Sequence, residues 1–537
     1  MTVPAAPPPD PQVGTAAQRA VSPVRVGTLA PVPAPGPPRP SRVIPTPLAA
    51  LAELAELTGL AGAPPAPTAP GDQLVTGITH DSRAVRPGDL YSALPGAHAH
   101  GASFAAEAAA AGAVALLTDA RGAALATGAG LPAIVVPDPR AALGPVSARV
   151  YGDPSGRLAV HGVTGTNGKT TTAYLLEAGF AAAGHRTGLI GTIETRVAGE
   201  RLGSTRTTPE APDLQALLAL MVERGVTAVA MEVSSHALAL GRVDGTHFAT
   251  ATFTNLSQDH LDFHADMEDY FAAKASLFTA DRCAAAVVDV DDRWGVRLAD
   301  AVTGVPVARV GAHADWRIER REPGAFVLHR PDGLPVPAST RLLGAFNTDN
   351  AALALTALLV TGVPEPAAVQ GLTELAGVPG RAERVEEAEG FLAVVDYAHT
   401  PDAVAALLGM LRPLTAGRLI AVLGCGGDRD RAKRPLMGAA VAAGADVAVL
   451  TDDNPRSEAS GDIIAAMRAG ISAGARAEVL VEPDRRAAIR LAVARARPGD
   501  TVVVAGKGHE SGQEVAGVVA PFDDRVVLRE ALAGVVA

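Results

Sequence analysis

The sequence has few aromatic residues, two cysteines and no long apolar run, and each scarcity excludes a class of protein. Only 3% of the 537 residues are aromatic, so the hydrophobic 48% consists mostly of Ala, Val and Leu, whose small side chains suit close helix–sheet packing. Cys283 and Cys425 cannot cross-link a chain of this length, which indicates a reducing compartment. No run of about 18 apolar residues is present, so we expect no membrane insertion. The beginning of the chain lacks the continuous apolar segment of a secretory signal, and the predicted location is the cytoplasm.

Basic segments are also lacking. The net charge is −11 and no long basic run occurs, so nucleic acid is not an expected partner. Local clusters of Gly, Lys and Arg can still bind phosphate within an acidic protein. A chain of this length predicts roughly two to four domains rather than one core.

Composition and periodicity divide the chain into four parts. Residues 1–47 hold 14 of the 42 prolines and are predicted to form a disordered extension. Residues 48–155 begin with a helix over 48–62 and continue as a small α/β domain. Residues 156–379 alternate strands and helices, which is typical of a parallel sheet, and residues 380–537 restart the alternation as a dinucleotide-binding-like domain. The expected strands are 89–94, 113–117, 133–136, 158–163, 228–232, 251–255, 285–289, 392–396, 418–423, 447–450 and 501–505, and the expected helices include 105–111, one ending near 183, and 460–470.

A glycine-rich loop follows the expected strand 158–163. Its sequence, Gly165-Thr166-Asn167-Gly168-Lys169-Thr170-Thr171, places glycines where backbone N–H groups can approach phosphate at a helix N-terminus. Lys169 would neutralise the phosphates of ATP, and Thr170 would provide a ligand for Mg²⁺. The loop departs from the G-x-x-x-x-G-K-[ST] pattern in having Val163 at the first glycine position.

An acidic residue ends the next strong strand. Glu232 closes the strand 228–232, and the ends of such strands open onto the ligand crevice of a parallel sheet. We interpret Glu232 as a Mg²⁺ ligand, because a phosphate loop needs an acidic partner nearby. The alternative is an ordinary helix start that Ser234 caps.

Three polar loops follow strands of the last domain, at 424–430, 453–456 and 506–510. The segment Asp453-Asn454-Pro455-Arg456 offers acceptors for an ammonium group and a guanidinium fork for a carboxylate, so it can bind the zwitterionic end of an amino acid. Taken alone, the same four residues also make an ordinary turn. Because the three loops share strand ends, we expect them to build one crevice. A phosphate loop and an amino-acid site in one chain predict ATP-driven amide ligation.

From about residue 75 to its C-terminus the chain resembles the Mur ligases of peptidoglycan synthesis. Eleven segments carry the resemblance, in the family's order, and within the family they are similar to the diaminopimelate-adding members. These segments are Asp81-Ser82-Arg83, GTNGKTT (165–171), Thr207-Thr208-Pro209, EVSSH (232–236), NLSQDHLDFH (255–264), Gly344-Ala345-Phe346-Asn347, Pro379-Gly380-Arg381, DYAHTP (396–401), GCGGDRDRAKRP (424–435), DNPR (453–456) and GKGHE (506–510).

The resemblance implies a role for each matching position. Ser82 and residues 97–99 would contact the UDP group, and the rest of the UDP-N-acetylmuramoyl-dipeptide would be bound by Thr207, Thr208, Ser234 and Arg242. ATP would be bound by Gly165, Thr166, Asn167, Gly168, Lys169, Thr170 and Thr171, with Asn347, Arg381 and Asp396. Magnesium would be held by Thr170 and Glu232, by His260, and by Lys274 as a carbamate, and the catalytic residues would be Lys169, Lys274 and His260. Diaminopimelate would be bound by Arg429, Asp453, Asn454, Pro455, Arg456, Gly506 and Glu510. Leu240 departs from the pattern, since a polar substrate contact is expected there.

The resemblance also implies the architecture and the reaction. The expected fold has an N-terminal UDP-binding domain, a central P-loop ATPase-like domain and a C-terminal Rossmann-like domain, in a monomer. ATP would activate the D-glutamate side-chain carboxylate as an acyl phosphate, which the amine of diaminopimelate would attack. The alternatives are a sister ligase that adds L-lysine, a folylpolyglutamate synthetase-like ligase, and a nucleotide-binding or kinase-like protein that does not ligate. The choice between meso and LL diaminopimelate stays open.

Overall fold

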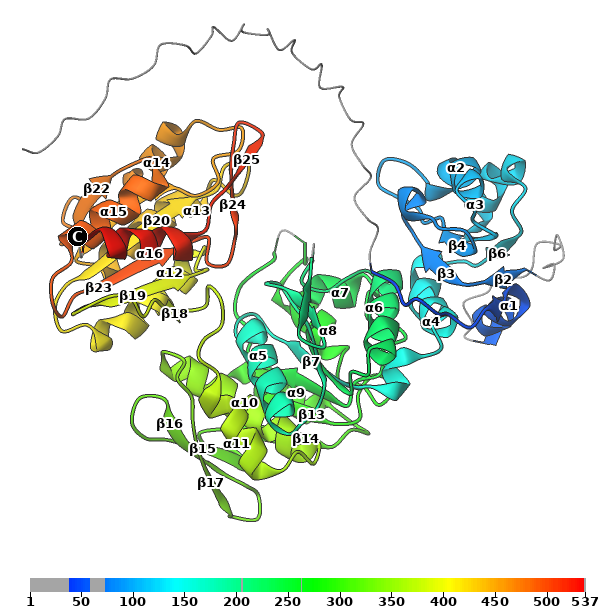
Figure 1. Cartoon of the computed structure of the whole chain (residues 1–537), viewed down its shortest axis with the longest axis horizontal. Coiled ribbons are helices and arrows are strands. Elements are labelled where there is room, and N and C mark those ends of the chain that lie inside the picture. The colour runs from blue at the N-terminus through cyan, green and yellow to red at the C-terminus, as the bar shows by residue number, and fades with distance from the viewer. Residues whose placement is uncertain (1–37, 58–72, 204–205, 262, 536–537) are drawn as a thin grey trace, which may run out of the picture. The chain divides into compact units, whose positions relative to one another are not determined.

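Three larger sheets organise the chain, and each is built from one continuous stretch of sequence (Figure 1). The computed structural model describes residues 38–57, 73–203, 206–261 and 263–535. In these residues the larger sheets have four, eleven and six strands. Strands alternate with helices throughout, which confirms the predicted α/β class. The strands of the three sheets lie within 48–155, 156–379 and 380–537, and the exact domain boundaries stay predictions. None of the described helices is long and apolar enough to cross a membrane.

The first sheet is parallel, in the order β3-β4-β5-β6. Neighbouring residues of β4 face opposite sides, as a pleated strand requires: Leu90 packs with α1 and α4, and Tyr91 packs with α2. Helices therefore cover both faces of this sheet. The elements are β3 (Gly77–Thr79), β4 (Asp89–Ser92), β5 (Ala115–Thr118), β6 (Ala133–Val135), α1 (Leu48–Leu57), α2 (Ala105–Ala110), α3 (Ala120–Leu125) and α4 (Pro139–Val150).

Residues 38–47 are ordered, although their proline content predicted that they belong to a disordered extension. Strand β1 (Thr46–Pro47) pairs with β2 (Leu74–Val75), and Arg39 forms a buried ion pair with Asp89 at 2.6 Å. Ser41 N–H donates to the Glu223 carboxylate at 2.7 Å. Proline content alone missed these contacts because it does not reveal buried charge pairing. Residues 1–37 of the expected extension and 58–62 of the expected first helix lie outside the described residues.

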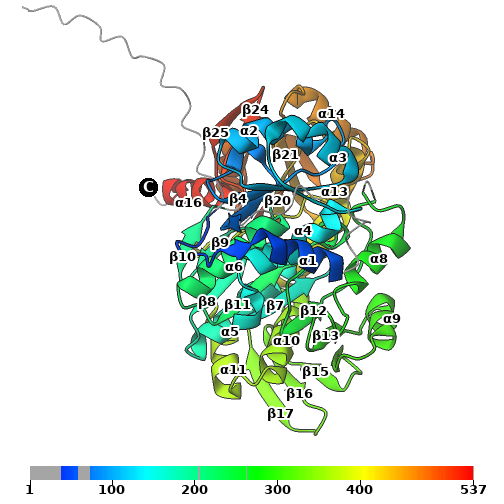
Figure 2. The same cartoon turned by 90° about the vertical axis from the view of Figure 1, so that its right-hand side faces the viewer.

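The second sheet has a parallel centre and antiparallel edges, in the order β10-β9-β8-β11-β7-β12-β13-β14-β15-β16-β17. Helices α5, α10 and α11 pack on one face, and α6, α8 and α9 pack on the other (Figure 2). The parallel strands are β7 (Ala159–Thr164), β8 (Thr187–Ile190), β11 (Ala228–Glu232), β12 (Thr250–Phe253), β13 (Ala286–Asp289), β14 (Val307–Gly311) and β15 (Trp316–Arg320). The helices are α5 (Lys169–Ala182), α6 (Ala211–Glu223), α7 (Ser235–Ala239), α8 (Met267–Ala275), α9 (Arg293–Ala301), α10 (Ala345–Val360) and α11 (Glu365–Glu374).

The antiparallel edges add to the expected parallel sheet, and the sequence did not predict them. They are formed by β9 (Thr195–Val197), β10 (Glu200–Leu202), β16 (Ala325–His329) and β17 (Pro335–Ser339). The connections are short turns with Gly199, Gly324 and Gly333 at positive φ, a conformation that favours hairpins over helical crossovers.

The third sheet has the order β18-β19-β23-β20-β21-β22, and all its pairs are parallel except β18 with β19. Helices α12, α13 and α14 cover one face, and α15 and α16 cover the other. The strands are β18 (Glu383–Arg384), β19 (Leu392–Asp396), β20 (Leu419–Cys425), β21 (Val447–Asp452), β22 (Glu478–Val481) and β23 (Thr501–Ala505), with a separate ribbon of β24 (Gly512–Val515) and β25 (Val518–Pro521). The helices are α12 (Pro401–Leu411), α13 (Lys433–Gly444), α14 (Ser460–Ala469), α15 (Arg485–Arg495) and α16 (Asp524–Val535).

Candidate active site

The glycine-rich loop joins β7 to α5, and close packing requires its glycines. Gly165 has φ +149° and Gly168 has φ +86°. A Cβ atom on Gly165 would lie 1.9 Å from the Thr254 hydroxyl oxygen, and one on Gly168 would lie 2.4 Å from the Asn350 amide oxygen. The loop leads directly into the N-terminus of α5, where backbone N–H groups and the helix dipole favour an anion. This geometry fits phosphate binding.

Two lysine side chains converge on one carbonyl group of this loop. Lys169 Nζ donates to the carbonyl oxygens of Gly165 at 3.0 Å and Thr166 at 2.9 Å, and Lys274 Nζ donates to Gly165 at 2.8 Å. Lys274 is 1% exposed, and its Nζ lies 4.6 Å from the centre of the Tyr270 ring. Burial, together with the charge of Lys169, lowers the pKa of Lys274 well below its usual range. A carbamate forms on an unprotonated amine, so these surroundings fit the predicted modification.

Thr170 and Glu232, the predicted ligands of one Mg²⁺, lie in contact. Thr170 Oγ1 donates to Glu232 Oε2 at 2.9 Å, and Thr192 donates its backbone N–H (2.7 Å) and its hydroxyl (3.1 Å) to the same carboxylate. Within the described residues no three His, Cys, Asp or Glu side chains form a metal cluster. One carboxylate and a hydroxyl beside a phosphate loop nevertheless fit Mg²⁺, which in such sites takes few protein ligands and completes its shell with phosphate and water. Thr192 was not predicted, since nothing in its local sequence marks it.

His260 lies in an aromatic cluster rather than alone on a loop. Its ring centre is 4.8 Å from that of His236 and 6.1 Å from that of Tyr270, the ring that contacts Lys274. Its φ is +54°, an unusual value for a residue other than glycine. The cluster therefore connects His260 to the buried lysine, and a role for His260 at a second Mg²⁺ stays a prediction.

Residues predicted to bind the muramoyl-dipeptide converge on the end of β11. The Thr208 hydroxyl donates to the backbone carbonyl of Glu232 at 2.9 Å and accepts from Ser234 N–H at 3.1 Å. The hydroxyl oxygens of Thr207 and Thr192 are 2.9 Å apart. The Ser234 side chain also caps α7, which confirms the alternative prediction that this segment is a capped helix start. Capping and ligand binding are compatible, because the cap uses only one hydroxyl lone pair.

Arg242, the remaining predicted contact of the dipeptide, belongs to a group of arginines around Glu210. Its Nε lies 2.8 Å from Glu210, which also pairs with Arg140 at 2.7 Å and Arg206 at 3.3 Å. Burial alone would raise the pKa of Glu210, but the charges of Arg242 and Arg140 lower it below its usual range. Three arginines around one carboxylate leave a local positive charge, which suits an anionic substrate. Leu240, the departure from the family pattern, is half-buried next to this group.

Two predicted nucleotide contacts lie near the start of the third sheet. The Arg381 guanidinium stacks 4.7 Å from the centre of the Tyr397 ring, and its Nη2 is 3.5 Å from the Thr170 hydroxyl. Asp396 accepts two backbone N–H groups at 2.6 and 2.7 Å. Burial raises the pKa of Asp396, against the opposing charge of Arg381. Arg381 thus lies beside the phosphate loop, where an anionic ligand would meet it.

Asn347, a third predicted nucleotide contact, supports the phosphate loop from behind. It is 2% exposed on α10, and its Oδ1 accepts from the amide of Asn350 at 3.0 Å. Asn350 in turn lies against Gly168. The contact of Asn347 with nucleotide itself stays a prediction.

The three loops expected to form one crevice do meet, at the carboxyl ends of β23, β20 and β21, which are neighbours in the sheet. Gly427 N–H donates to the carbonyl of Asn454 at 2.8 Å, and Arg456 Nη1 donates to the carbonyl of Gly427 at 2.7 Å. A Cβ atom on Gly506 would lie 2.7 Å from the Asp453 carboxylate. Arg429 is exposed at the same rim, and Pro455 is buried.

Arg456 is held from two sides. Its backbone N–H donates to the carbonyl of Glu514 in β24 at 3.0 Å, and its Nε is 3.4 Å from the Glu514 carboxylate. Its φ of +53° directs the side chain out of the turn toward Gly427. The contribution of β24 was not predicted, because a short surface ribbon carries no signal for its partner.

A polar cluster joins the second and third of these loops. Asn454 Nδ2 donates to Asp453 Oδ1 and Glu510 Oε2, each at 3.0 Å, and Asn454 Oδ1 accepts from Lys507 Nζ at 3.0 Å. Lys507 Nζ is also 3.1 Å from Glu510 Oε2 and 3.8 Å from Asp453 Oδ1. Acidic oxygens beside Arg456 form a surface that can bind both ends of a zwitterion. Of this cluster, only Lys507 was not predicted.

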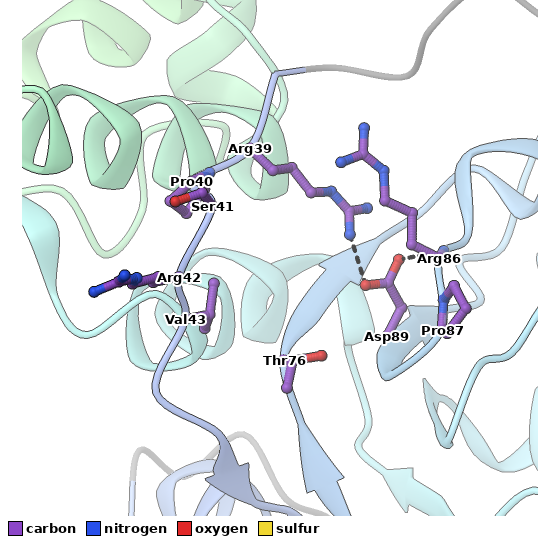
Figure 3. Close-up of a pocket in the computed structure, with 9 residues that line it drawn as sticks. All are labelled: Arg39, Pro40, Ser41, Arg42, Val43, Thr76, Arg86, Pro87 and Asp89. Atoms are coloured by element: carbon purple, nitrogen blue, oxygen red, sulfur yellow. Dashed lines mark hydrogen bonds and ion pairs between the residues drawn. The ribbon is translucent and has the colours of Figure 1, made fainter.

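Ser82 and residues 97–99, the predicted UDP contacts, follow the carboxyl ends of β3 and β4, and residues 97–99 are exposed. At the opposite ends of the same strands is a cavity of about 390 Å³ (Figure 3). Within it, Arg39 and the backbone N–H of Arg86 both bind Asp89. Because ligands of parallel sheets bind at carboxyl ends, this cavity is separate from the predicted UDP contacts. Its lining residues are Arg39, Pro40, Ser41, Arg42, Val43, Thr76, Arg86, Pro87 and Asp89.

Models of known families match three segments of the chain. They are the Mur ligase family, catalytic domain, over residues 74–151, the Mur ligase middle domain over 163–358, and the Mur ligase, glutamate ligase domain over 380–508. The UDP-N-acetylmuramoyl-L-alanyl-D-glutamate–2,6-diaminopimelate ligase of Streptomyces coelicolor is 57% identical over 93% of this chain and 98% of its own length. The enzyme of the same name from Corynebacterium glutamicum is 52% identical over 86% and 92%.

Solved structures of related ligases align with this chain. A 2,6-diaminopimelate ligase of the same name aligns with a TM-score of 0.64 at 35% identity, over 87% of this chain and 96% of that one. A bifunctional folylpolyglutamate synthase/dihydrofolate synthase from Yersinia pestis aligns with a TM-score of 0.56 at 21% identity, over 74% and 93%, and shares the fold alone. The identity and coverage of the first set of relatives establish that this chain belongs to the Mur ligase family.

Proposed function

We propose that this chain is an ATP-dependent ligase that joins 2,6-diaminopimelate to the D-glutamate side-chain carboxylate of UDP-N-acetylmuramoyl-L-alanyl-D-glutamate, a step of peptidoglycan precursor synthesis. The observation that carries the proposal is the meeting of three loops around Asp453, Asn454 and Arg456, in a chain that also has a glycine-rich loop suited to phosphate at the start of α5. We infer a cytoplasmic location, because ATP and the nucleotide-linked substrate would be available there.

The phosphate loop supports the first half of the reaction. The γ-phosphoryl group of ATP passes to the D-glutamate carboxylate, giving an acyl phosphate and ADP. Lys169 and the N-terminus of α5 would stabilise the charge on the transferring group. Thr170 and Glu232 would hold Mg²⁺, which neutralises phosphate charge when bound, and the carbamate of Lys274 would add an oxygen ligand.

The three loops support the second half. The reacting amine of diaminopimelate attacks the acyl carbon, an amide bond forms, and phosphate leaves with the bonding electrons. The far end of diaminopimelate carries an ammonium and a carboxylate. We assign the ammonium to the acidic oxygens of Asp453 and Glu510, and the carboxylate to Arg456 with Arg429 at the rim. No protein nucleophile is needed, since positioning and electrostatics suffice.

An ADP-release assay tests the proposal. The purified chain is given ATP, Mg²⁺ and the UDP-dipeptide, with or without one amino acid from a panel of meso-diaminopimelate, LL-diaminopimelate and L-lysine. We expect ADP only when a diaminopimelate isomer is present. Release with L-lysine alone would identify the sister ligase, and release without any amino acid would indicate a kinase-like protein.

A further inference from the structure

Lysine is nearly absent from this chain, and the few lysines that occur are informative. Among the 46 basic residues only Lys169, Lys274, Lys433 and Lys507 are lysines, and the rest are arginines. Where only a positive charge is needed, arginine serves, but it cannot replace lysine where a compact ammonium group must fit. The phosphate loop and the predicted carbamate explain Lys169 and Lys274. Lys433 and Lys507 have no role assigned, and of these two Lys507 is fully buried whereas Lys433 is half-buried.

Lys507 is completely buried and fixes the orientation of Asn454. The Asn454 Oδ1 atom accepts both from Lys507 Nζ and from Glu514 N–H, each at 3.0 Å. An amide whose oxygen is held by two donors must turn its NH₂ group the other way, here toward Asp453 and Glu510. Without the Lys507 ammonium group, the Asn454 Oδ1 atom would keep only the Glu514 N–H donor, and the orientation of the amide would be less firmly fixed.

Lys507 also holds two carboxylates together. Its Nζ lies 3.1 Å from Glu510 and 3.8 Å from Asp453, whose side chains are 35% and 12% exposed. Two negative groups in a partly buried site repel each other, and one of them would move away or take up a proton if no cation lay between them. Both hydrogen bonds that Glu510 accepts in this cluster use Oε2, which leaves Oε1 as an acceptor that the cluster does not use.

The Lys507 ammonium group is enclosed by its acceptors. The side chain is 0% exposed, and Nζ has Asn454 Oδ1 at 3.0 Å and Glu510 Oε2 at 3.1 Å. The backbone on either side of it is also closely packed. Gly506 and Gly508 have φ +114° and +54°, and a Cβ atom on Gly508 would lie 2.7 Å from Tyr397 Cβ. A planar guanidinium is bulkier than an ammonium and needs more space for its donors. A guanidinium at the end of this side chain would therefore displace the acceptors that surround the ammonium group.

We propose that Lys507 is a positioning residue for the amino-acid substrate. It sets the Asn454 amide and the Glu510 carboxylate in the orientation that receives the ammonium at the non-reacting end of diaminopimelate, without touching the substrate itself. This inference rests on the proposed function. It makes the buried Lys507 responsible for the selectivity of the predicted diaminopimelate site, although Lys507 lies beneath that site.

The first test compares Lys507→Met with Arg418→Met. Arg418 is the matched control: it precedes β20 and pairs at 3.0 Å with Asp500, which precedes β23, so it links two of the same strands at their opposite ends. We expect Lys507→Met to raise the KM for meso-diaminopimelate about 100-fold, with the KM for ATP and for the UDP-dipeptide within about threefold. Arg418→Met should leave all three KM values unchanged. Equal KM values for diaminopimelate in Lys507→Met and the parent would overturn the proposal.

Two further variants separate positioning from simple charge. Lys507→Arg should fail to restore the KM for diaminopimelate, because the site fits an ammonium; a parent-like KM would contradict the argument. In a double-mutant cycle, Lys507→Met is combined with Glu510→Gln. The KM of the double variant for diaminopimelate should be no higher than that of the more impaired single variant, since both substitutions disrupt the same arrangement. Independent, multiplying effects would show that Lys507 does not act through Glu510.

A measurement on the unmodified protein covers the case in which Lys507→Met fails to fold. With [ε-¹³C]lysine, the chain gives only four side-chain signals. We expect meso-diaminopimelate to shift the Lys507 signal and a non-hydrolysable ATP analogue to shift that of Lys169. An unmoved Lys507 signal at saturating diaminopimelate would reject the positioning role while the ligation assay still supported the enzyme's function. A chain that releases no ADP with diaminopimelate would instead reject the function first.

Discussion

At the residue scale, Lys274 is 1% exposed and lies near a second lysine, so its surroundings disfavour the charged form of its amine. The pKa of Lys274 is lowered well below its usual range, by burial first and by Lys169 second. Above that lowered pKa the amine is neutral and can take up CO₂, and below it protonation removes the lone pair. The expected carbamate therefore forms more readily as the pH rises.

Removal of CO₂ should reveal this modification. Enzyme dialysed at mildly acid pH in CO₂-free buffer should lose activity, and bicarbonate at higher pH should restore it. Lys274→Arg keeps the charge but has no primary amine to carbamylate, and we expect kcat to fall about 10–100-fold without rescue by bicarbonate. A ¹³C-carbamate signal from [¹³C]bicarbonate, absent in Lys274→Arg, is the direct measurement. Full activity in CO₂-free buffer would refute the modification.

Arg456 supplies the second residue-scale prediction. Replacing it by Ala removes the guanidinium fork beside Asn454, so we expect the KM for diaminopimelate to rise about 100-fold while ATP binding is unchanged. Arg431→Ala is the control, because Arg431 pairs with Glu458 near the same loops but is 74% exposed. Steady-state kinetics with each substrate varied in turn makes the comparison, and an Arg456→Ala enzyme that saturates with diaminopimelate like the parent would disprove the assignment.

At the scale of elements, a buried ion pair connects the ends of the two strands that lead into the loops at 453–456 and 506–510. Arg485, at the start of α15, and Asp524, at the start of α16, are both 0% exposed and 2.7 Å apart. Arg485 also donates to the carbonyl of Asp452, which ends β21, and to that of Ala505, which ends β23, each at 3.0 Å. One guanidinium thus fixes the residues just before Asp453 and Gly506.

Breaking that pair should cost much stability. Arg485→Met leaves the Asp524 carboxylate buried without its partner, and we expect the free energy of unfolding to fall by about 3–5 kcal/mol. The exposed pair of Arg495 and Glu478, in the same domain, is the comparison: Arg495→Ala should cost about 0–1 kcal/mol. Urea unfolding followed by circular dichroism measures both changes, and equal losses in the two variants would contradict the role of burial.

Local sequence predicted many of the buried parallel strands and the loops at their ends, but the parallel strands β3, β8, β14, β15 and β22 were not among those expected. Strands 228–232, 392–396 and 501–505 match the structure residue for residue, because apolar runs between turn signals mark buried parallel strands. The antiparallel edge strands and β1 were missed, since half-exposed strands carry weaker patterns. Lys507 was missed for another reason: its partner Asn454 is 53 positions away, and only folding brings them together. The sequence motifs predicted which loops form the site, whereas the buried groups that orient these loops could be identified only from the structure.

At the scale of the whole molecule, each of the three sheets carries one of the three predicted binding sites. The first carries the predicted UDP contacts, the second carries the phosphate loop with Lys274 and Glu232, and the third carries the loops around Asn454 and Arg456. A ligation that joins a nucleotide-linked dipeptide to an amino acid at the expense of ATP needs all three kinds of site. The matches to Mur ligase models over 74–151, 163–358 and 380–508 follow the same division.

The mass of the ligation product in a competition tests the proposed function most directly. The purified chain, ATP, Mg²⁺ and the UDP-dipeptide are incubated with equal concentrations of meso-diaminopimelate, LL-diaminopimelate and L-lysine, and the products are separated and weighed by mass spectrometry. We expect one major product, whose mass is that of the UDP-dipeptide plus diaminopimelate minus water. A product with the mass of the lysine adduct, or ADP formed without any adduct, would contradict the proposed function.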